Sequence, residues 1–167
     1  DLNISDMYGN KVRLSSLHGK VILVDFWSAM AGNSNQLNAE LKELYAKYAE
    51  RGFEIYQVGI ESSKAVWVSA VQEQKLPWIS VSDLQGTAST AVKMYNVQNV
   101  PTNFLIDREG NIVGRYFKAH PAPSEVKTDN EGGHELDVAY SYEASSPYIL
   151  ELEGLRFAFL TCYDFYF

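Results

Sequence analysis

The sequence is poor in cysteine, in positive charge and in long apolar runs. It contains one cysteine, Cys162, so neither an intramolecular disulfide nor a dithiol active site can form within one chain. No apolar stretch approaches the ~20 residues of a membrane-spanning helix. The formal net charge of -7 and the lack of a basic cluster argue against nucleic acid as a partner.

The composition is otherwise that of a globular protein, with 46% hydrophobic and 21% charged residues among 167. Charge is unevenly spread: residues 1–117 hold 11 Lys+Arg and 12 Asp+Glu, whereas residues 118–167 hold 3 and 9. Prolines and glycines gather in the stretch 118–134. We therefore predict a domain at 1–117, a linker at 118–134 and a β-rich acidic extension at 135–167.

Three consecutive segments predict a strand, a helix and a second strand. The run 21–27 is almost entirely apolar and predicts a buried strand. Apolar residues recur at helical spacing over 34–51, and Gly52 follows as a stop. The segment 53–60 is rich in strand formers, and it should run parallel to the first strand because a helix joins the two.

The rest of the first 117 residues predicts a mixed sheet with a parallel centre and an antiparallel edge, flanked by helices. Val12 and Leu14 suit a half-buried strand in an N-terminal hairpin, and Val66, Trp67, Ala70 and Val71 should face inward from one helix. The other predicted elements are a helix at 64–74, a strand at 79–81, a helix at 87–95, and paired antiparallel strands at 103–106 and 112–117.

Several segments together resemble one family. They are Ile22–Trp27, Val100-Pro101-Thr102, Phe104–Val113, Leu14–Lys20, and Pro77-Trp78 with Asp83-Leu84. In this order they resemble the TlpA/ResA-type thiol–disulfide oxidoreductases of bacteria, which stand beside the redoxins of the AhpC/TSA type within the thioredoxin-like superfamily. The resemblance covers residues 1–117. It implies an α/β, three-layer thioredoxin-like sandwich, and a place in the bacterial periplasm or cell envelope. The sequence begins at Asp1, so the lack of a signal peptide carries no information on compartment.

The resemblance places the family's two active-site cysteines at Ala31 and Ser34. Asn33 stands where the family usually has proline, and Met30 where it has an aromatic residue. The family's buried acid, which accepts a proton from the second thiol, corresponds to Asp25, and Pro101 corresponds to the cis-proline. Disulfide exchange needs a thiolate at the helix N-terminus, so these replacements argue against the family's reaction.

Each of these residues also has a structural interpretation. Ser34 lacks a triad-like base and is better suited to capping the helix than to nucleophilic attack. Asp25, whose burial should favour the neutral form, is either a structural relic or a group still used in binding or pH sensing. Pro101 either presents backbone to a peptide or only shapes the edge of the core. Trp27, together with the other two tryptophans, is best explained as packing.

The sequence therefore predicts a thioredoxin-like module that binds a peptide or protein without redox chemistry. The proposed groove consists of Trp27, Met30, Ala31, Ser34, Val100, Pro101 and Thr102. No cofactor is expected, and no metal, because His134 has no second histidine at ligand spacing. The extension 135–167 could supply an oligomer interface, since its last segment is apolar on both faces.

Two alternatives remain open from the sequence alone. The chain could be an oxidoreductase of this family whose cysteines were replaced by mutagenesis, although the changes at Met30 and Asn33 argue against it. It could instead use Cys162 with a partner's thiol. A peroxidase is less well supported, because Ala31 stands where the peroxidatic thiol is expected.

Overall fold

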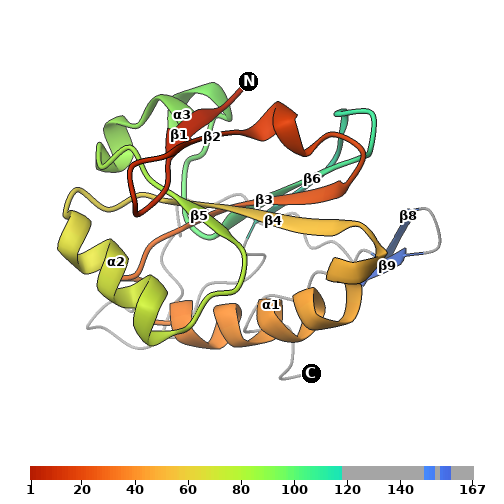
Figure 1. Ribbon diagram of the computed structural model, residues 1–167, viewed down its shortest axis with the longest axis horizontal. Coiled ribbons are helices and arrows are strands. Elements are labelled where there is room, and N and C mark those ends of the chain that lie inside the picture. Colours follow the sequence, from red (N-terminus) through yellow and green to blue (C-terminus); the bar gives the residue numbers. More distant parts are fainter. Residues whose placement is uncertain (118–148, 153–154, 159–167) are drawn as a thin grey trace, which may run out of the picture. The chain divides into compact units, whose positions relative to one another are not determined.

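The structure is a computed structural model that describes residues 1–117, 149–152 and 155–158 (Figure 1). The chain divides into two compact units, Asp1–Phe117 and Lys118–Phe167. Within the described residues, no helix is long and apolar enough to cross a membrane.

In the second unit the described residues form two short strands. These are β8 (Ile149–Leu152) and β9 (Leu155–Ala158), which pair in antiparallel fashion. The predicted linker 118–134 lies outside the described residues. So does the rest of the predicted extension 135–167, including Cys162.

The first unit is built on a five-stranded mixed sheet with β3 at its centre. The strand order is β5–β4–β3–β6–β7. β3 and β4 are parallel, as are β4 and β5, whereas β6 is antiparallel to both β3 and β7. The bounds are β3 (Val21–Trp27), β4 (Phe53–Gly59), β5 (Ile79–Val81), β6 (Thr102–Ile106) and β7 (Ile112–Phe117). Every residue of β3 and β4 is buried, as expected for central strands covered on both faces.

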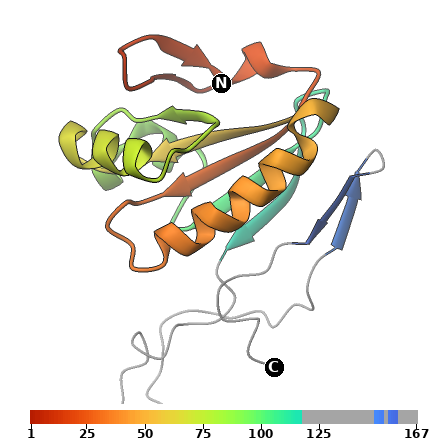
Figure 2. The ribbon, with the colours of Figure 1, turned by 60° about the horizontal axis from the view of Figure 1, so that its bottom comes forward.

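Helices and a hairpin cover the two faces of this sheet. α1 (Ser34–Tyr48) and α2 (Lys64–Glu73) lie on one face, and Figure 2 shows α1 crossing it. α3 (Thr90–Met94) and the hairpin of β1 (Asn3–Ser5) and β2 (Lys11–Arg13) lie on the other (Figure 1). The predicted three-layer sandwich is therefore confirmed for the first unit.

α1 ends as the sequence predicts. A short 3-10 turn, η2 (Ala49–Arg51), follows it, and Gly52 closes the helix in the left-handed region at φ +86°. A Cβ on Gly52 would lie 2.9 Å from a guanidinium nitrogen of Arg108. Glycine is therefore favoured there for its conformation, whereas a Cβ would only require the Arg108 guanidinium to shift.

The predicted helix over 87–95 is wrong in extent. Two short pieces replace it, the 3-10 turn η3 (Gly86–Ala88) and α3. Ser89 between them is extended, with φ −47° and ψ 135°, and its hydroxyl accepts the Ala91 N–H at 3.2 Å. This cap starts a new helix, because Ser89 leaves the helical conformation to make it.

Two side chains also differ from the sequence prediction. Leu14 begins a 3-10 helix, η1 (Leu14–Leu17), instead of extending β2, and its N–H donates to the Leu2 carbonyl at 2.9 Å. Val66 is 39% exposed, whereas Trp67 and Val71 are buried. Trp67 and Val71 are four residues apart and define the inner face of α2, whereas Val66 points about 100° away from Trp67 and about 140° away from Val71.

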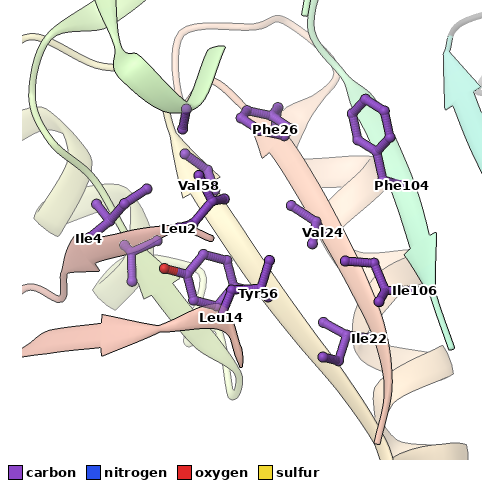
Figure 3. Close-up of a cluster of buried hydrophobic side chains, with 12 residues drawn as sticks. Leu2, Ile4, Leu14, Ile22, Val24, Phe26, Tyr56, Val58, Phe104 and Ile106 are labelled. Atoms are coloured by element: carbon purple, nitrogen blue, oxygen red, sulfur yellow. The ribbon is translucent and has the colours of Figure 1, made fainter. Parts of the chain in front are cut away.

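A large apolar cluster lies between the sheet and the layer of α3 and the N-terminal hairpin (Figure 3). Alternate side chains of β3 point into it, because side chains of a strand alternate between faces. Phe26 contacts the rings of Phe104 and Tyr95, with centroids 6.0 and 5.5 Å apart. The labelled members are Leu2, Ile4, Leu14, Ile22, Val24, Phe26, Tyr56, Val58, Phe104 and Ile106.

Replacing Phe26 by alanine should destabilise the first unit strongly. The side chain is fully buried among aromatic neighbours, so Phe26→Ala should lower the free energy of unfolding by about 3–5 kcal/mol. Urea unfolding would measure the change. The exposed Val66→Ala is the control and should shift it by less than about 1 kcal/mol. Equal effects of the two changes would contradict this placement of the core.

Candidate functional site

The loop that joins β3 to α1, residues 28–33, is the centre of the candidate site. The Ala31 N–H donates to the Ser28 carbonyl at 3.1 Å, and the Ser34 N–H donates to the Ala31 carbonyl at 3.0 Å. The Met30 N–H donates to the Ser28 hydroxyl at 3.1 Å. These bonds close the loop and leave the Met30 side chain 78% exposed.

Ser34 does not cap the helix, so that prediction is wrong. Asn33 occupies the N-cap position, and no side chain makes a capping bond there. Ser34 is the first residue of α1, and its hydroxyl donates to the Ala29 carbonyl at 3.5 Å. A carbonyl oxygen can accept this bond but is too weak a base to activate the hydroxyl as a nucleophile.

The Val100–Pro101 segment lies at the same edge of the sheet as this loop. The peptide bond between these two residues is cis, as the resemblance implies. β6 begins at the next residue, Thr102, which pairs with Phe26 near the end of β3. The Thr102 hydroxyl donates to the Asn99 carbonyl at 2.7 Å. Strand pairing therefore brings the two sequence-predicted segments to one edge.

The predicted groove residues differ in exposure. Trp27, Ser34 and Thr102 are buried, at 4%, 7% and 2% exposed, so their side chains support this edge from within. Four others reach the surface: Met30 is exposed, and Ala31, Val100 and Pro101 are half-buried. We call these four residues, Met30, Ala31, Val100 and Pro101, the loop face.

Asp25 is buried in the middle of the sheet and accepts hydrogen bonds from both neighbouring strands. Strand register places Gln57 of β4 and Asn103 of β6 directly opposite Asp25, so the three side chains share one face. The Gln57 Nε2 donates to one carboxylate oxygen at 2.8 Å, and the Asn103 Nδ2 donates to the other. The carboxylate is thus partnered on both oxygens.

This pairing continues into the helical layer above the sheet. The Gln57 Nε2 also donates to the Asn38 Oδ1 of α1 at 2.8 Å. The Trp78 Nε1 donates to the Gln57 Oε1 at 3.0 Å, and the Asn38 Nδ2 donates to the Gln74 Oε1 at 2.7 Å. One hydrogen-bond network therefore joins β3, β4 and β6 to the first half of α1 and to the segment after α2.

Sequence reasoning missed the amide side chains of this network. A signal for them was present: Gln57 is a polar residue in a strand of apolar and aromatic neighbours, and Asn38 lies one helical turn after Ser34. Which groups they would meet depends on strand register and on the placement of α1, and neither follows from a local pattern.

Burial raises the pKa of Asp25 from its ordinary value of 3.8 to about 6. The cause is removal of the charged form from water, and the hydrogen bonds from Gln57 and Asn103 oppose the shift because they stabilise the carboxylate. The direction agrees with the expectation from the sequence. A pKa of about 6 leaves the group largely ionised at neutral pH, which suits its two N–H donors.

Asp25 should lower the free energy of unfolding as the pH rises from about 4 to about 7. In this range the folded state keeps a proton that the unfolded state has lost. The contribution of Asp25 to the free energy of unfolding is therefore greatest at low pH and disappears as the pH passes the pKa of the folded state. The free energy of unfolding of the natural chain minus that of Asp25→Asn should fall by about 3 kcal/mol across the range. Urea unfolding at a series of pH values measures it. A difference that stays constant with pH would contradict the raised pKa.

A second buried carboxylate, Glu61, contacts the loop. Its Oε1 accepts the Ala29 N–H at 2.5 Å, and its side chain is 6% exposed. The sequence offers no signal for this residue, because an acidic side chain after a strand carries no motif. Within the described part of the chain, no group of three or more His, Cys, Asp or Glu residues is arranged to hold a metal ion.

The first unit is similar to several thiol–disulfide oxidoreductases. ResA of Bacillus cereus is 30% identical over 110 residues, which are 66% of this chain and 62% of ResA. The chain thus spans less than two thirds of the length of this relative. The thioredoxin domain of a thiol-disulfide oxidoreductase from Bacteroides vulgatus superposes with a TM-score of 0.65 at 29% identity, covering 70% of this chain and 84% of that one.

A further solved structure, an uncharacterized thioredoxin-like protein from Bacteroides vulgatus, is 38% identical, with a TM-score of 0.62 and coverage of 69% and 74%. The sequence profile of the AhpC/TSA family matches residues 1–115, which is more than half of the chain. The chain belongs to the AhpC/TSA family, within the thioredoxin-like proteins of the TlpA/ResA type.

Proposed function

We propose that this chain is a thioredoxin-like module that binds a peptide or protein segment without redox chemistry. The observation that carries the proposal is the identity of residues 31 and 34. The resemblance to the family places its two cysteines at these positions, and here they are Ala31 and Ser34.

Thiol–disulfide exchange starts when a thiolate attacks a disulfide sulfur and forms a mixed disulfide. The methyl group of Ala31 has no nucleophilic atom. The hydroxyl of Ser34 donates to the Ala29 carbonyl, and no base partners it in the contacts of the described residues. The N-terminus of α1 would lower the pKa of a thiol placed there, but neither side chain supplies one.

Features suited to binding accompany this loss. Met30 extends into solvent from a loop closed by backbone hydrogen bonds, and Ala31, Val100 and Pro101 lie half-buried at the same edge. A thioether side chain adapts to varied apolar partners. Backbone groups beside an exposed strand end can pair with an extended chain. The loop face therefore suits an extended peptide with an apolar side chain.

Membership of the family supports a second candidate, a thiol–disulfide oxidoreductase. In this case the cysteines were replaced by mutation, or Cys162 reacts with a thiol of a partner. The lone Cys162 could form a mixed disulfide with another chain but could not resolve it internally.

We further infer a place in the bacterial periplasm or cell envelope, since the relatives reported above are bacterial thiol–disulfide oxidoreductases. An oligomer formed through the extension 135–167 is part of the same proposal. Fractionation of the producing cell would test the first, and sedimentation of the chain with and without residues 118–167 would test the second.

Reductase activity separates the two candidate functions. The natural chain should not accelerate the reduction of a protein disulfide by dithiothreitol, whereas Ala31→Cys with Ser34→Cys should gain activity, because both thiols would then stand at the start of α1. A Cys162→Ser variant is the matched control. Activity in the natural chain that disappears in this control would overturn the binding proposal in favour of the Cys162 candidate.

Binding is tested separately with a library of short random peptides selected on the natural chain. Peptides that bind the loop face should lose about tenfold in affinity for Met30→Asp, which places a charge on the apolar patch. Tyr8→Asp is the control, since Tyr8 is 80% exposed in the N-terminal hairpin turn. Equal losses with the two variants, or no selected peptide that depends on Met30, would count against the loop face as the binding site.

A further inference from the structure

Glu61 holds the backbone of the loop that carries the loop face. It lies two residues after the end of β4, and its Oε1 accepts the Ala29 N–H at 2.5 Å. The carbonyl of Ala29 accepts the Ser34 hydroxyl at 3.5 Å. Two buried side chains thus hold both polar groups of the residue that directly precedes Met30.

The position of Glu61 is itself closely restricted. A Cβ on Gly59 would lie 2.8 Å from the Trp67 Nε1 and 3.1 Å from the Glu61 Oε2, so the indole and the carboxylate both pack against the bare Cα of Gly59. Trp67 is 1% exposed and belongs to an apolar cluster with Trp27 and Val71. The Glu61 carboxylate is therefore already packed in place to accept the Ala29 N–H before any partner binds.

Stability alone does not account for a carboxylate here. The Glu61 Oε2 is buried without a protein partner, as are the indole N–H groups of Trp27 and Trp67 in the same region. A buried acidic group with one unpartnered oxygen is unfavourable compared with an apolar side chain of similar size. What the carboxylate provides is the bond to the Ala29 N–H.

We infer that Glu61 is a positioning residue of the loop face: it fixes the Ala29 peptide so that Met30 and Ala31 are presented to a partner in one conformation. This role rests on the proposed binding function, because Glu61 would order the loop to which the partner binds. A preordered loop loses less conformational entropy on binding, so affinity rises without a direct contact between Glu61 and the partner.

Two readouts test this role. In Glu61→Leu, the Ala29 amide should exchange with solvent about tenfold faster, and peptides selected on the natural chain should bind about tenfold more weakly. Glu61→Gln should restore both, because its amide oxygen can accept the same N–H. Glu61→Asp, which keeps the charge but withdraws the carboxylate by one methylene, should resemble Glu61→Leu and serves if the leucine variant does not fold.

Glu54 offers a matched control. It is also a buried glutamate, at 7% exposed, but lies within β4; it binds the Lys20 Nζ at 2.9 Å and accepts a hydrogen bond from the Tyr45 hydroxyl at 3.1 Å. It lies near the start of the strand, whereas the loop face lies beyond the opposite end. Glu54→Leu should reduce stability and leave both the Ala29 exchange relative to global unfolding and the peptide affinity unchanged.

The outcomes separate this inference from the proposed function. Unchanged Ala29 exchange in Glu61→Leu and Glu61→Asp would overturn the positioning role, as would an increase that Glu54→Leu reproduces. Faster Ala29 exchange confined to the Glu61 variants, with no peptide binding to the natural chain, would support the hold on the loop and overturn the binding function. Faster exchange with weaker peptide binding would support both.

Discussion

Two amide side chains donate hydrogen bonds to the buried Asp25 carboxylate, and the polar network between the sheet and α1 is built on these two bonds. β3 is covered on both faces, so a carboxylate on it has no access to water. Register supplies partners from both sides, Gln57 on β4 and Asn103 on β6. Without these donors the pKa of Asp25 would be raised further, and the protonated form would be favoured over the carboxylate.

The network then determines how the helical layer sits. Gln57 bonds Asp25 and Asn38 with the same amide nitrogen, so the sheet and α1 are linked by directional contacts and not by apolar packing alone. The opposite face of the same strands is a cluster of apolar and aromatic side chains. Apolar packing tolerates shifts that hydrogen bonds do not. The bond between Gln57 and Asn38 therefore helps to position the first half of α1, which the β3–α1 loop precedes.

The family's fold is present in the first unit, and Ala31 and Ser34 stand at the positions that the resemblance assigns to the family's thiols. The hydrogen bonds from Gln57 and Asn103 give Asp25 a structural role that does not depend on a neighbouring thiol. A second carboxylate, Glu61, holds the loop from the end of β4. If the proposed binding function holds, the hydrogen bonds that order this loop would serve to present a surface to a partner.

Local patterns were sufficient for most elements, since burial of continuous apolar runs and helical spacing identify strands and helices directly. They failed where a single residue changed the local conformation, as with Ser89, which divides a predicted helix by capping a new one. They also failed for side chains whose neighbours lie far away in the sequence. The contact between Asn103 and Asp25 spans 78 positions, and that between Glu61 and Ala29 spans 32.

The sequence by itself determined the order of most elements and the buried position of Asp25, because these depend on residue type and local periodicity. The resemblance to the family added that Ala31 and Ser34 stand where its cysteines are expected. Only the tertiary structure decided which groups partner Asp25, that Ser34 donates to the Ala29 carbonyl and does not cap α1, and that Glu61 holds the loop. The physical reason is that a buried polar group is defined by its partners. Those partners are brought together by strand register and layer packing, and no local pattern specifies either.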